Sequence, residues 1–230
     1  GSSLTAFELI SDLCLELVAS HFPEHRRPFA QPSPYYVLLE TSDSEGEAHA
    51  AAMFEALMER AIEAGIVRDA VVATSGAQSR ALWALRELIS DAQALVGKNI
   101  KHDVSVPISS IGEFVERTNA ELQRRFPGIR MVVFGHLGDG NLHYNVSPAV
   151  DRCGPGHEAE FLALQPAINL VTHDAVHAFG GSISAEHGLG QLRRDESARY
   201  KSAVELTLMR RGKKGPPPPG GMKPAEKVPP

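Results

Sequence analysis

Hydrophobic and polar positions along this chain follow two periods, one typical of helices and the other typical of strands. Residues 4–20 place apolar side chains at helical spacing, which predicts an N-terminal helix. Residues 35–40 are rich in tyrosine, valine and leucine between a proline and a polar loop, which predicts a strand. By the same criteria, further helices are predicted over 48–64, 79–95, 111–126, 158–179 and 196–211, and further strands over 69–73, 99–106, 129–135 and 141–146.

The order of these elements predicts the fold class. The last two strands are close enough in sequence to form a hairpin around Asp139-Gly140. Helices that join strands on one side of a mostly antiparallel sheet favour an α+β fold of the ferredoxin-like kind. We expect an N-terminal helix and linker over 1–33, one folded domain over 34–209, and a flexible tail rich in proline and glycine over 210–230.

Composition narrows the class of protein. The chain has 230 residues, of which 43% are hydrophobic and 22% charged, with a net charge of -5, as in an ordinary globular protein. The charges are interspersed, which argues against nucleic-acid binding, and the sequence predicts no membrane span and no signal peptide. Two distant cysteines, Cys14 and Cys153, favour a reducing compartment, the cytoplasm or, in a eukaryote, the mitochondrial matrix.

Two histidine-containing segments carry the candidate chemistry. Residues 135–143 read Gly-His-Leu-Gly-Asp-Gly-Asn-Leu-His, which places His136 and His143 at either end of the predicted hairpin turn. Cross-strand neighbours have Cβ atoms about 5 Å apart, close enough for two imidazoles to share one ion. Residues 184–190 add Glu186 as a third ligand. Two imidazoles and one carboxylate suit zinc, iron(II) or manganese and leave room for a substrate, whereas the simpler alternative is a set of surface turn residues.

Other polar residues could act beside such a metal. His187 follows Glu186 directly, so in extended backbone its side chain would diverge from the ligand and could serve as a general base. Arg86 and Ser90 are spaced i and i+4 on a predicted helix, and Lys101 lies on the following strand. Together these three could hold a carboxylate, although an arginine in this setting could equally be solvated.

Three segments of this sequence resemble a known family. The motifs at 135–143 and 184–190, with Leu-Trp-Ala-Leu-Arg-Glu at 82–87, are similar to the C-terminal substrate and metal domain of FAD-linked D-2-hydroxyacid dehydrogenases. That family includes D-2-hydroxyglutarate and D-lactate dehydrogenases and the glycolate oxidase FAD subunit, within the vanillyl-alcohol oxidase superfamily. The resemblance covers roughly residues 35–200, which correspond to most of the expected folded domain.

The resemblance implies a role for each candidate residue. His136, His143 and Glu186 would bind a divalent metal, most simply zinc, and His187 would take the proton of the substrate hydroxyl. Asn145 would hydrogen-bond the substrate. The distal carboxylate of the substrate would be held by Arg86, Ser90 and Lys101, with Ser90 standing where a threonine is expected.

The resemblance also implies a substrate, a cofactor and partners. The substrate would be a small 2-hydroxy acid, D-2-hydroxyglutarate before D-lactate or glycolate, oxidised to the 2-oxo acid with FAD as hydride acceptor. We expect the FAD-binding domain outside this chain, removed or on another subunit, because residues 1–33 carry no glycine-rich phosphate loop. At 220–224 the expected flavin-contacting motif is only partly kept, with Lys223 in place of asparagine. Further expected partners are an electron-acceptor protein or quinone and a second copy in a homodimer.

Two other classes of function remain open from the sequence. A self-contained metal-dependent hydrolase could use the same two histidines and one glutamate, and hydrolysis without flavin would favour it. A non-catalytic binding module could keep the fold as an interaction surface. Absence of bound metal, together with no effect of His143→Ala on any activity, would favour the binding module.

Overall fold

A computed structural model gives the fold of the chain and describes residues 3–154, 156–188 and 194–214. Its centre is a five-stranded antiparallel sheet with the order β2-β1-β4-β5-β3. The strands are β1 (Leu4–Ser11), β2 (Tyr35–Thr41), β3 (Asp103–Ser105), β4 (Arg130–His136) and β5 (Asn141–Ser147). Helices and an antiparallel sheet in one fold confirm the predicted α+β class.

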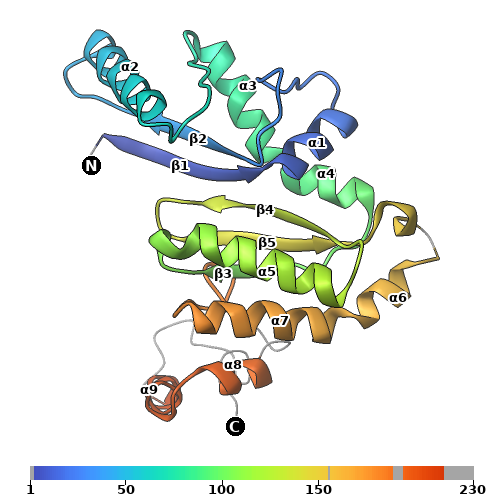
Figure 1. Ribbon diagram of the computed structural model, residues 1–230. Coiled ribbons are helices and arrows are strands. Elements are labelled where there is room, and N and C mark those ends of the chain that lie inside the picture. The colour runs from blue at the N-terminus through green and yellow to red at the C-terminus, as the bar shows by residue number, and fades with distance from the viewer. Residues whose placement is uncertain (1–2, 155, 189–193, 215–230) are drawn as a thin grey trace.

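Helices cover both faces of this sheet (Figure 1). Their bounds are α1 (Asp12–His21), α2 (Glu47–Glu63), α3 (Gly76–Glu87), α4 (Ile89–Val96), α5 (Ile111–Arg125), α6 (Glu158–Ala163), α7 (Gln165–Ala178), α8 (Arg194–Tyr200) and α9 (Ala203–Lys214), with short 3-10 helices at Ile108–Ser110 and Val150–Arg152. One buried cluster joins α1, α3 and α4 to Val132 and Phe134 of β4. The other joins α5, α6 and α7 to Val133 of β4 and to alternate residues of β5. Alternate residues of β4 therefore face opposite cores.

The predicted N-terminal helix over residues 4–20 is wrong in its first half. Residues Leu4–Ser11 form β1, which pairs with both β2 and β4, and α1 begins only at Asp12. Leu9 and Ile10 are both buried, in opposite cores, so this strand does not show the alternation that would distinguish it from a helix. The segment is thus part of the sheet. The domain boundaries at 33 and 209 stay predictions, and residues 215–230 of the tail, with the motif at 220–224, lie outside the described residues.

Several other elements are shorter than predicted. The segment 69–73 forms no regular strand, and of the strand predicted over 99–106 only β3 and an isolated bridge at Ile100 are present. Ser110 makes no side-chain cap, although its spacing from Glu113 suggested a capping box. Three predicted helices are each divided into two, α3–α4 at Leu88, α6–α7 at Leu164 and α8–α9 near Ser202. The second break has a local cause, because Pro166 at the start of α7 lacks the N–H that would continue α6.

The predicted hairpin between β4 and β5 is confirmed. Its register pairs Phe134 with His143 and Val132 with Asn145. At the turn, Gly140 has φ +82°, and a Cβ atom there would lie 2.2 Å from the carbonyl oxygen of Val106. Glycine is therefore required for the hairpin to approach the chain that follows β3.

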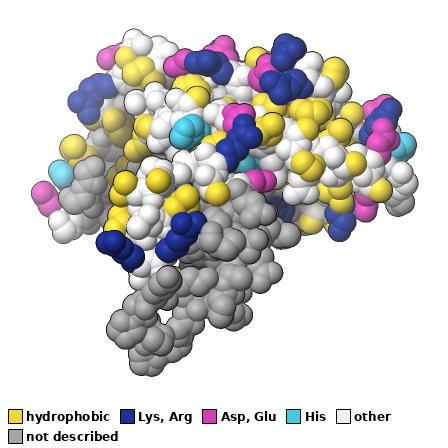
Figure 2. Space-filling model, turned by 90° about the horizontal axis from the view of Figure 1, so that it is seen from below, with side chains coloured by type: hydrophobic (Ala, Val, Ile, Leu, Met, Phe, Trp, Pro, Cys, Tyr) yellow, Lys and Arg dark blue, Asp and Glu magenta, His cyan; other side chains and the backbone are white. Residues whose placement is uncertain are grey.

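Charged side chains of both signs lie on the face of the molecule that Figure 2 shows. Over the coloured part of the face in Figure 2, basic side chains are scattered among acidic and hydrophobic ones. The described residues on that face therefore do not form the kind of basic patch that binds nucleic acid. In the described part of the chain, no helix is both long and apolar enough to cross a membrane.

Candidate metal and substrate site

The register of the sheet gathers polar side chains on one of its faces. Glu8 of β1 pairs with His136 of β4, and His143 of β5 pairs with Asp103 of β3. Paired residues of neighbouring strands point to the same face of a sheet. His143 also pairs with Phe134, which lies two residues before His136 on β4 and therefore points to the same face as His136. Four strands thus bring two carboxylates and two imidazoles to one side of the sheet.

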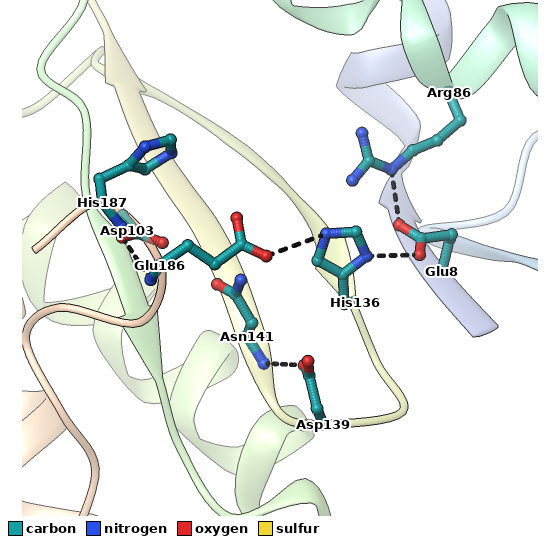
Figure 3. Close-up of polar contacts among 8 residues, drawn as sticks. All are labelled: Glu8, Arg86, Asp103, His136, Asp139, Asn141, Glu186 and His187. Atoms are coloured by element: carbon teal, nitrogen blue, oxygen red, sulfur yellow. Dashed lines mark hydrogen bonds and ion pairs between the residues drawn. The ribbon is translucent and has the colours of Figure 1, made fainter. Parts of the chain in front are cut away.

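A segment after α7 completes this group of residues. Ser182 exchanges backbone hydrogen bonds with Ser105 of β3, at 2.8 and 2.9 Å, so the segment runs along the sheet edge. A Cβ atom on Gly181 would lie 2.1 Å from the carbonyl oxygen of Ser105, which requires glycine for this close approach. Glu186 and His187 then follow at the end of the segment, above the face that carries the histidines (Figure 3).

The three predicted metal ligands come together in the structure. One ligand atom from each of His136, His143 and Glu186 lies within 4.8 Å of the other two. Glu186 Oε1 is 3.3 Å from His136 Nε2, close to the roughly 3.4 Å that separates neighbouring ligands of a tetrahedral zinc ion. Glu186 and His136 are 46% and 41% exposed, so an ion here would stay open to a substrate.

Unsatisfied polar groups around these ligands also fit a bound ion and substrate. Asn141 is only 3% exposed, and neither its amide oxygen nor its amide nitrogen has a hydrogen-bond partner among the described residues. Figure 3 shows this amide beside the carboxylate of Glu186. Buried polar groups in folded proteins are rarely left unpaired, so this site suits an occupant that brings further hydrogen bonds. The donor set and its surroundings therefore fit a divalent metal such as zinc.

Glu8 contacts His136 on the side opposite Glu186. Its Oε1 is 2.7 Å from His136 Nδ1, and its Oε2 accepts a hydrogen bond of 2.8 Å from Arg86 Nε. A carboxylate on Nδ1 favours the tautomer with the proton there, which leaves the Nε2 lone pair directed at the metal position. Glu8 is not among the site residues that the sequence predicts, because a helix over residues 4–20 would not place it in the sheet beside His136. A carboxylate in an otherwise apolar run of a strand would have been the signal.

The surroundings of His143 favour its neutral form, which is the form that binds metals. Burial lowers its pKa, and the positive charge of Arg86 lowers it further. The negative charges of Asp103 and Glu186 act in the opposite direction but do not outweigh these effects. A lowered pKa keeps the imidazole unprotonated to a lower pH, so the ring nitrogen stays available to an ion.

His187 lies beside the ligands, as predicted, and Asp103 contacts its backbone. The centroid of the His187 ring is 6.2 Å from that of His143. Ligand atoms of Asp103, His143 and His187 also lie within 4.8 Å of one another, so the geometry alone offers two overlapping ion positions that share His143. Asp103 is not among the predicted site residues, because its role depends on a backbone segment that begins to contact its carboxylate 83 residues further along the chain.

Comparison with known proteins identifies the family. Residues 1–225 match the sequence model of the FAD linked oxidases, C-terminal domain. The chain belongs to this family. It is 41% identical over 209 residues to a D-2-hydroxyglutarate dehydrogenase of Xanthomonas citri pv. viticola, a match that covers 90% of this chain and 42% of the relative. It is also 35% and 33% identical, over its whole length, to the mitochondrial D-2-hydroxyglutarate dehydrogenases of Rattus norvegicus and Arabidopsis thaliana, and covers 40% and 39% of them.

Membership of the FAD-linked oxidase family limits the classes of function. The chain spans about two-fifths of the length of these relatives. The family implies FAD as cofactor and an oxidoreductase as the class of enzyme. A metal-dependent hydrolase, the alternative that the sequence left open, receives no support from these comparisons.

The four predicted substrate-binding residues of this FAD-linked oxidase domain differ in their exposure to solvent and in whether they line a cleft. Arg86 lines a cleft of about 540 Å³ together with His136, and its guanidinium lies 4.8 Å over the ring of Phe134. Ser90 is exposed on α4, beyond the break at Leu88, so it does not share a continuous helix with Arg86. Lys101 is exposed and lies just before β3. Asn145 is buried, and its side chain accepts from the His102 N–H and donates to Gln93.

Replacement of Glu8 should destabilise the fold and weaken the metal site together. In Glu8→Ala, the guanidinium of Arg86, 13% exposed, loses its carboxylate partner. We expect a decrease of about 3 kcal/mol in the free energy of unfolding, measured by urea denaturation. Zinc affinity should fall about tenfold, measured by calorimetry, because His136 loses its orienting contact. Glu16→Ala on the exposed side of α1 is the matched control, and an equal loss of stability there would contradict this account.

Proposed function

We propose that this chain forms the substrate- and metal-binding part of a flavin-dependent D-2-hydroxyacid dehydrogenase. The preferred substrate is D-2-hydroxyglutarate, ahead of D-lactate and glycolate, and the product is the 2-oxo acid. The observation that carries the proposal is the convergence of His136, His143 and Glu186 within 4.8 Å, with His187 alongside, in a chain of the FAD-linked oxidase family. The names of the relatives support the choice of substrate.

In this proposal His136, His143 and Glu186 hold a divalent metal, zinc by preference. When bound, the metal supplies Lewis acidity that lowers the pKa of the substrate hydroxyl and orients it. FAD, on a flavin-binding domain or partner subunit, supplies the hydride acceptor. An acceptor protein or a quinone would be the further partner that takes up the electrons.

The protein side chains perform proton transfer and orientation. His187 takes the proton of the C2 hydroxyl, since an imidazole near neutral pH is an effective general base. Asn145 of β5, whose amide nitrogen donates to Gln93 in the buried part of the site, is proposed to hydrogen-bond the substrate. Because the ion pair of Arg86 with Glu8 uses Nε, the two terminal guanidinium nitrogens can bind a distal carboxylate. Ser90 and Lys101 assist Arg86 in this proposal.

The direct test is metal-dependent oxidation of the hydroxy acid. This chain would be combined with the flavin-binding domain or subunit and assayed with an artificial electron acceptor. We expect D-2-hydroxyglutarate to be oxidised, chelation to stop the reaction, and zinc to restore it. Oxidation that is indifferent to chelation would refute the metal role, and no oxidation of any 2-hydroxy acid would refute the assigned reaction.

Replacement of Arg86 should distinguish dicarboxylate from monocarboxylate substrates. Arg86→Lys keeps the positive charge beside Glu8 but removes the planar fork that binds a carboxylate through two nitrogens. We expect the KM for D-2-hydroxyglutarate to rise about tenfold, equivalent to about 1.4 kcal/mol. The KM for D-lactate, which has no distal carboxylate, should change little. Arg80→Lys, exposed on the same helix, is the control, and equal effects on both substrates would refute the distal grip.

The proposal extends to location and assembly. The relatives from Rattus norvegicus and Arabidopsis thaliana are named mitochondrial, so we propose the mitochondrial matrix for a eukaryotic source and the cytoplasm for a bacterial one. A homodimer of this chain is also proposed, and light scattering of the purified protein tests it.

A further inference from the structure

Asp103 binds three consecutive backbone N–H groups of the segment that carries Glu186 and His187. Its carboxylate Oδ2 accepts from the N–H of Glu186 at 2.9 Å and from the N–H of His187 at 2.8 Å. Its main-chain oxygen accepts from the N–H of Ala185 at 3.2 Å. Asp103 is 6% exposed, so these bonds are protected from competing water. One residue of β3 therefore fixes the backbone of this whole segment.

The position of Asp103 in the sheet links this segment to the other ligands. Asp103 pairs with His143 across β3 and β5, and His143 is a ligand contributed by the sheet. With their N–H groups held on one oxygen, the side chains of Glu186 and His187 leave the backbone in different directions. Glu186 reaches His136, at 3.3 Å (Figure 3). The centroid of the His187 ring lies 6.2 Å from that of His143.

We propose that Asp103 is a positioning residue that sets the metal ligand Glu186 and the base His187 relative to the sheet. The expected effect of Asp103 on zinc binding rests on the proposed function. Its expected effect on the backbone of residues 185–187 does not. Two N–H groups that converge on one carboxylate oxygen form charge-assisted bonds, which are stronger than bonds between neutral groups. The rival role is that of a direct ligand, since Asp103, His143 and His187 also form a compact set.

Two variants of Asp103 separate positioning from direct ligation. Asp103→Asn keeps an oxygen that can accept both N–H groups, whereas an amide is a poor zinc ligand. Asp103→Ala removes the acceptor altogether. Both are compared with the unmodified chain by hydrogen exchange of the amides of residues 185–187 without metal and by calorimetric zinc titration. Asp43→Ala is the matched control, because Asp43 also accepts a backbone N–H, from Glu45, but on a distant loop.

We expect Asp103→Ala to speed amide exchange at Glu186 and His187 at least tenfold and to weaken zinc binding about tenfold or more. Asp103→Asn should stay within about threefold of the unmodified chain in both measurements, by retaining the two hydrogen bonds. The amide of Val133 in the central strand reports whether the sheet remains folded in each variant.

The possible failures are distinguishable. Unchanged exchange in Asp103→Ala would overturn the positioning role, whether or not zinc binds. A loss of zinc binding in Asp103→Asn as large as in Asp103→Ala, with exchange still slow, would overturn it in favour of direct ligation. Absence of zinc binding by the unmodified chain would refute the proposed function, while the exchange measurement would still decide the role of Asp103.

Discussion

Replacement of His143 by alanine is expected to weaken zinc binding about a hundredfold and to lower turnover with it. His143 is the only residue common to both compact ligand sets among the described residues, so its loss disrupts either ion position. Zinc-binding peptides gain about 10–16 kcal/mol from four ligands, so one ligand contributes about 3 kcal/mol, or roughly two orders of magnitude in affinity. Calorimetric titration of zinc into the chain, with metal analysis of the purified variant, measures this loss.

The matched control for His143 is an exposed histidine away from the site. His21→Ala, at the end of α1, should leave zinc affinity unchanged. Hydroxy-acid oxidation in the flavin-containing assembly should fall in parallel with zinc occupancy in His143→Ala. A variant that keeps full zinc affinity would contradict the ligand assignment, and one that loses zinc yet keeps turnover would contradict a catalytic role for the metal.

Replacement of His187 by alanine is expected to separate metal binding from catalysis. The residue is proposed as the base, so zinc affinity should stay within a few-fold of the unmodified chain. Turnover should fall by about 10²- to 10⁴-fold, the usual contribution of a general base. The pair of measurements is again calorimetry for zinc and steady-state oxidation of D-2-hydroxyglutarate in the flavin-containing assembly.

Zinc binding by Glu186→Ala should be compared with zinc binding by His187→Ala. Glu186 is a ligand in one of the two possible ion positions, and His187 is a ligand in the other. If the ion lies between His136, His143 and Glu186, Glu186→Ala should weaken zinc binding far more than His187→Ala. If it lies between Asp103, His143 and His187, the order reverses. The reversed order would make His187 a ligand and would leave the reaction without its proposed base.

Separation along the chain explains which site residues could be predicted. Residues that meet through a local turn could be predicted from the sequence, and residues that meet through pairing of distant strands could not. His136 and His143 are seven residues apart around a glycine-rich turn, so local turn chemistry predicts that they meet. The register pairs His143 with Phe134 and not with His136, so the two rings meet diagonally, with centroids 6.2 Å apart. Glu8 reaches His136 only because β1 pairs with β4, across more than a hundred residues. Periodicity carries no information on such pairing, and a buried central strand resembles a helix in its apolar content.

The α+β class and the hairpin with its two histidines could be predicted from the sequence, because they depend on local periodicity and turn residues. Glu186 and His187 could be named as candidates from their residue types alone. The folded structure was needed to see that residues 4–11 form a strand, that Glu8 contacts His136 and pairs with Arg86, and that Asp103 fixes the backbone of Glu186 and His187 beside the hairpin. These features depend on strand order and on backbone hydrogen bonds between distant segments. Strand pairing is a property of the whole folded chain, and a single residue's neighbours in sequence do not specify it.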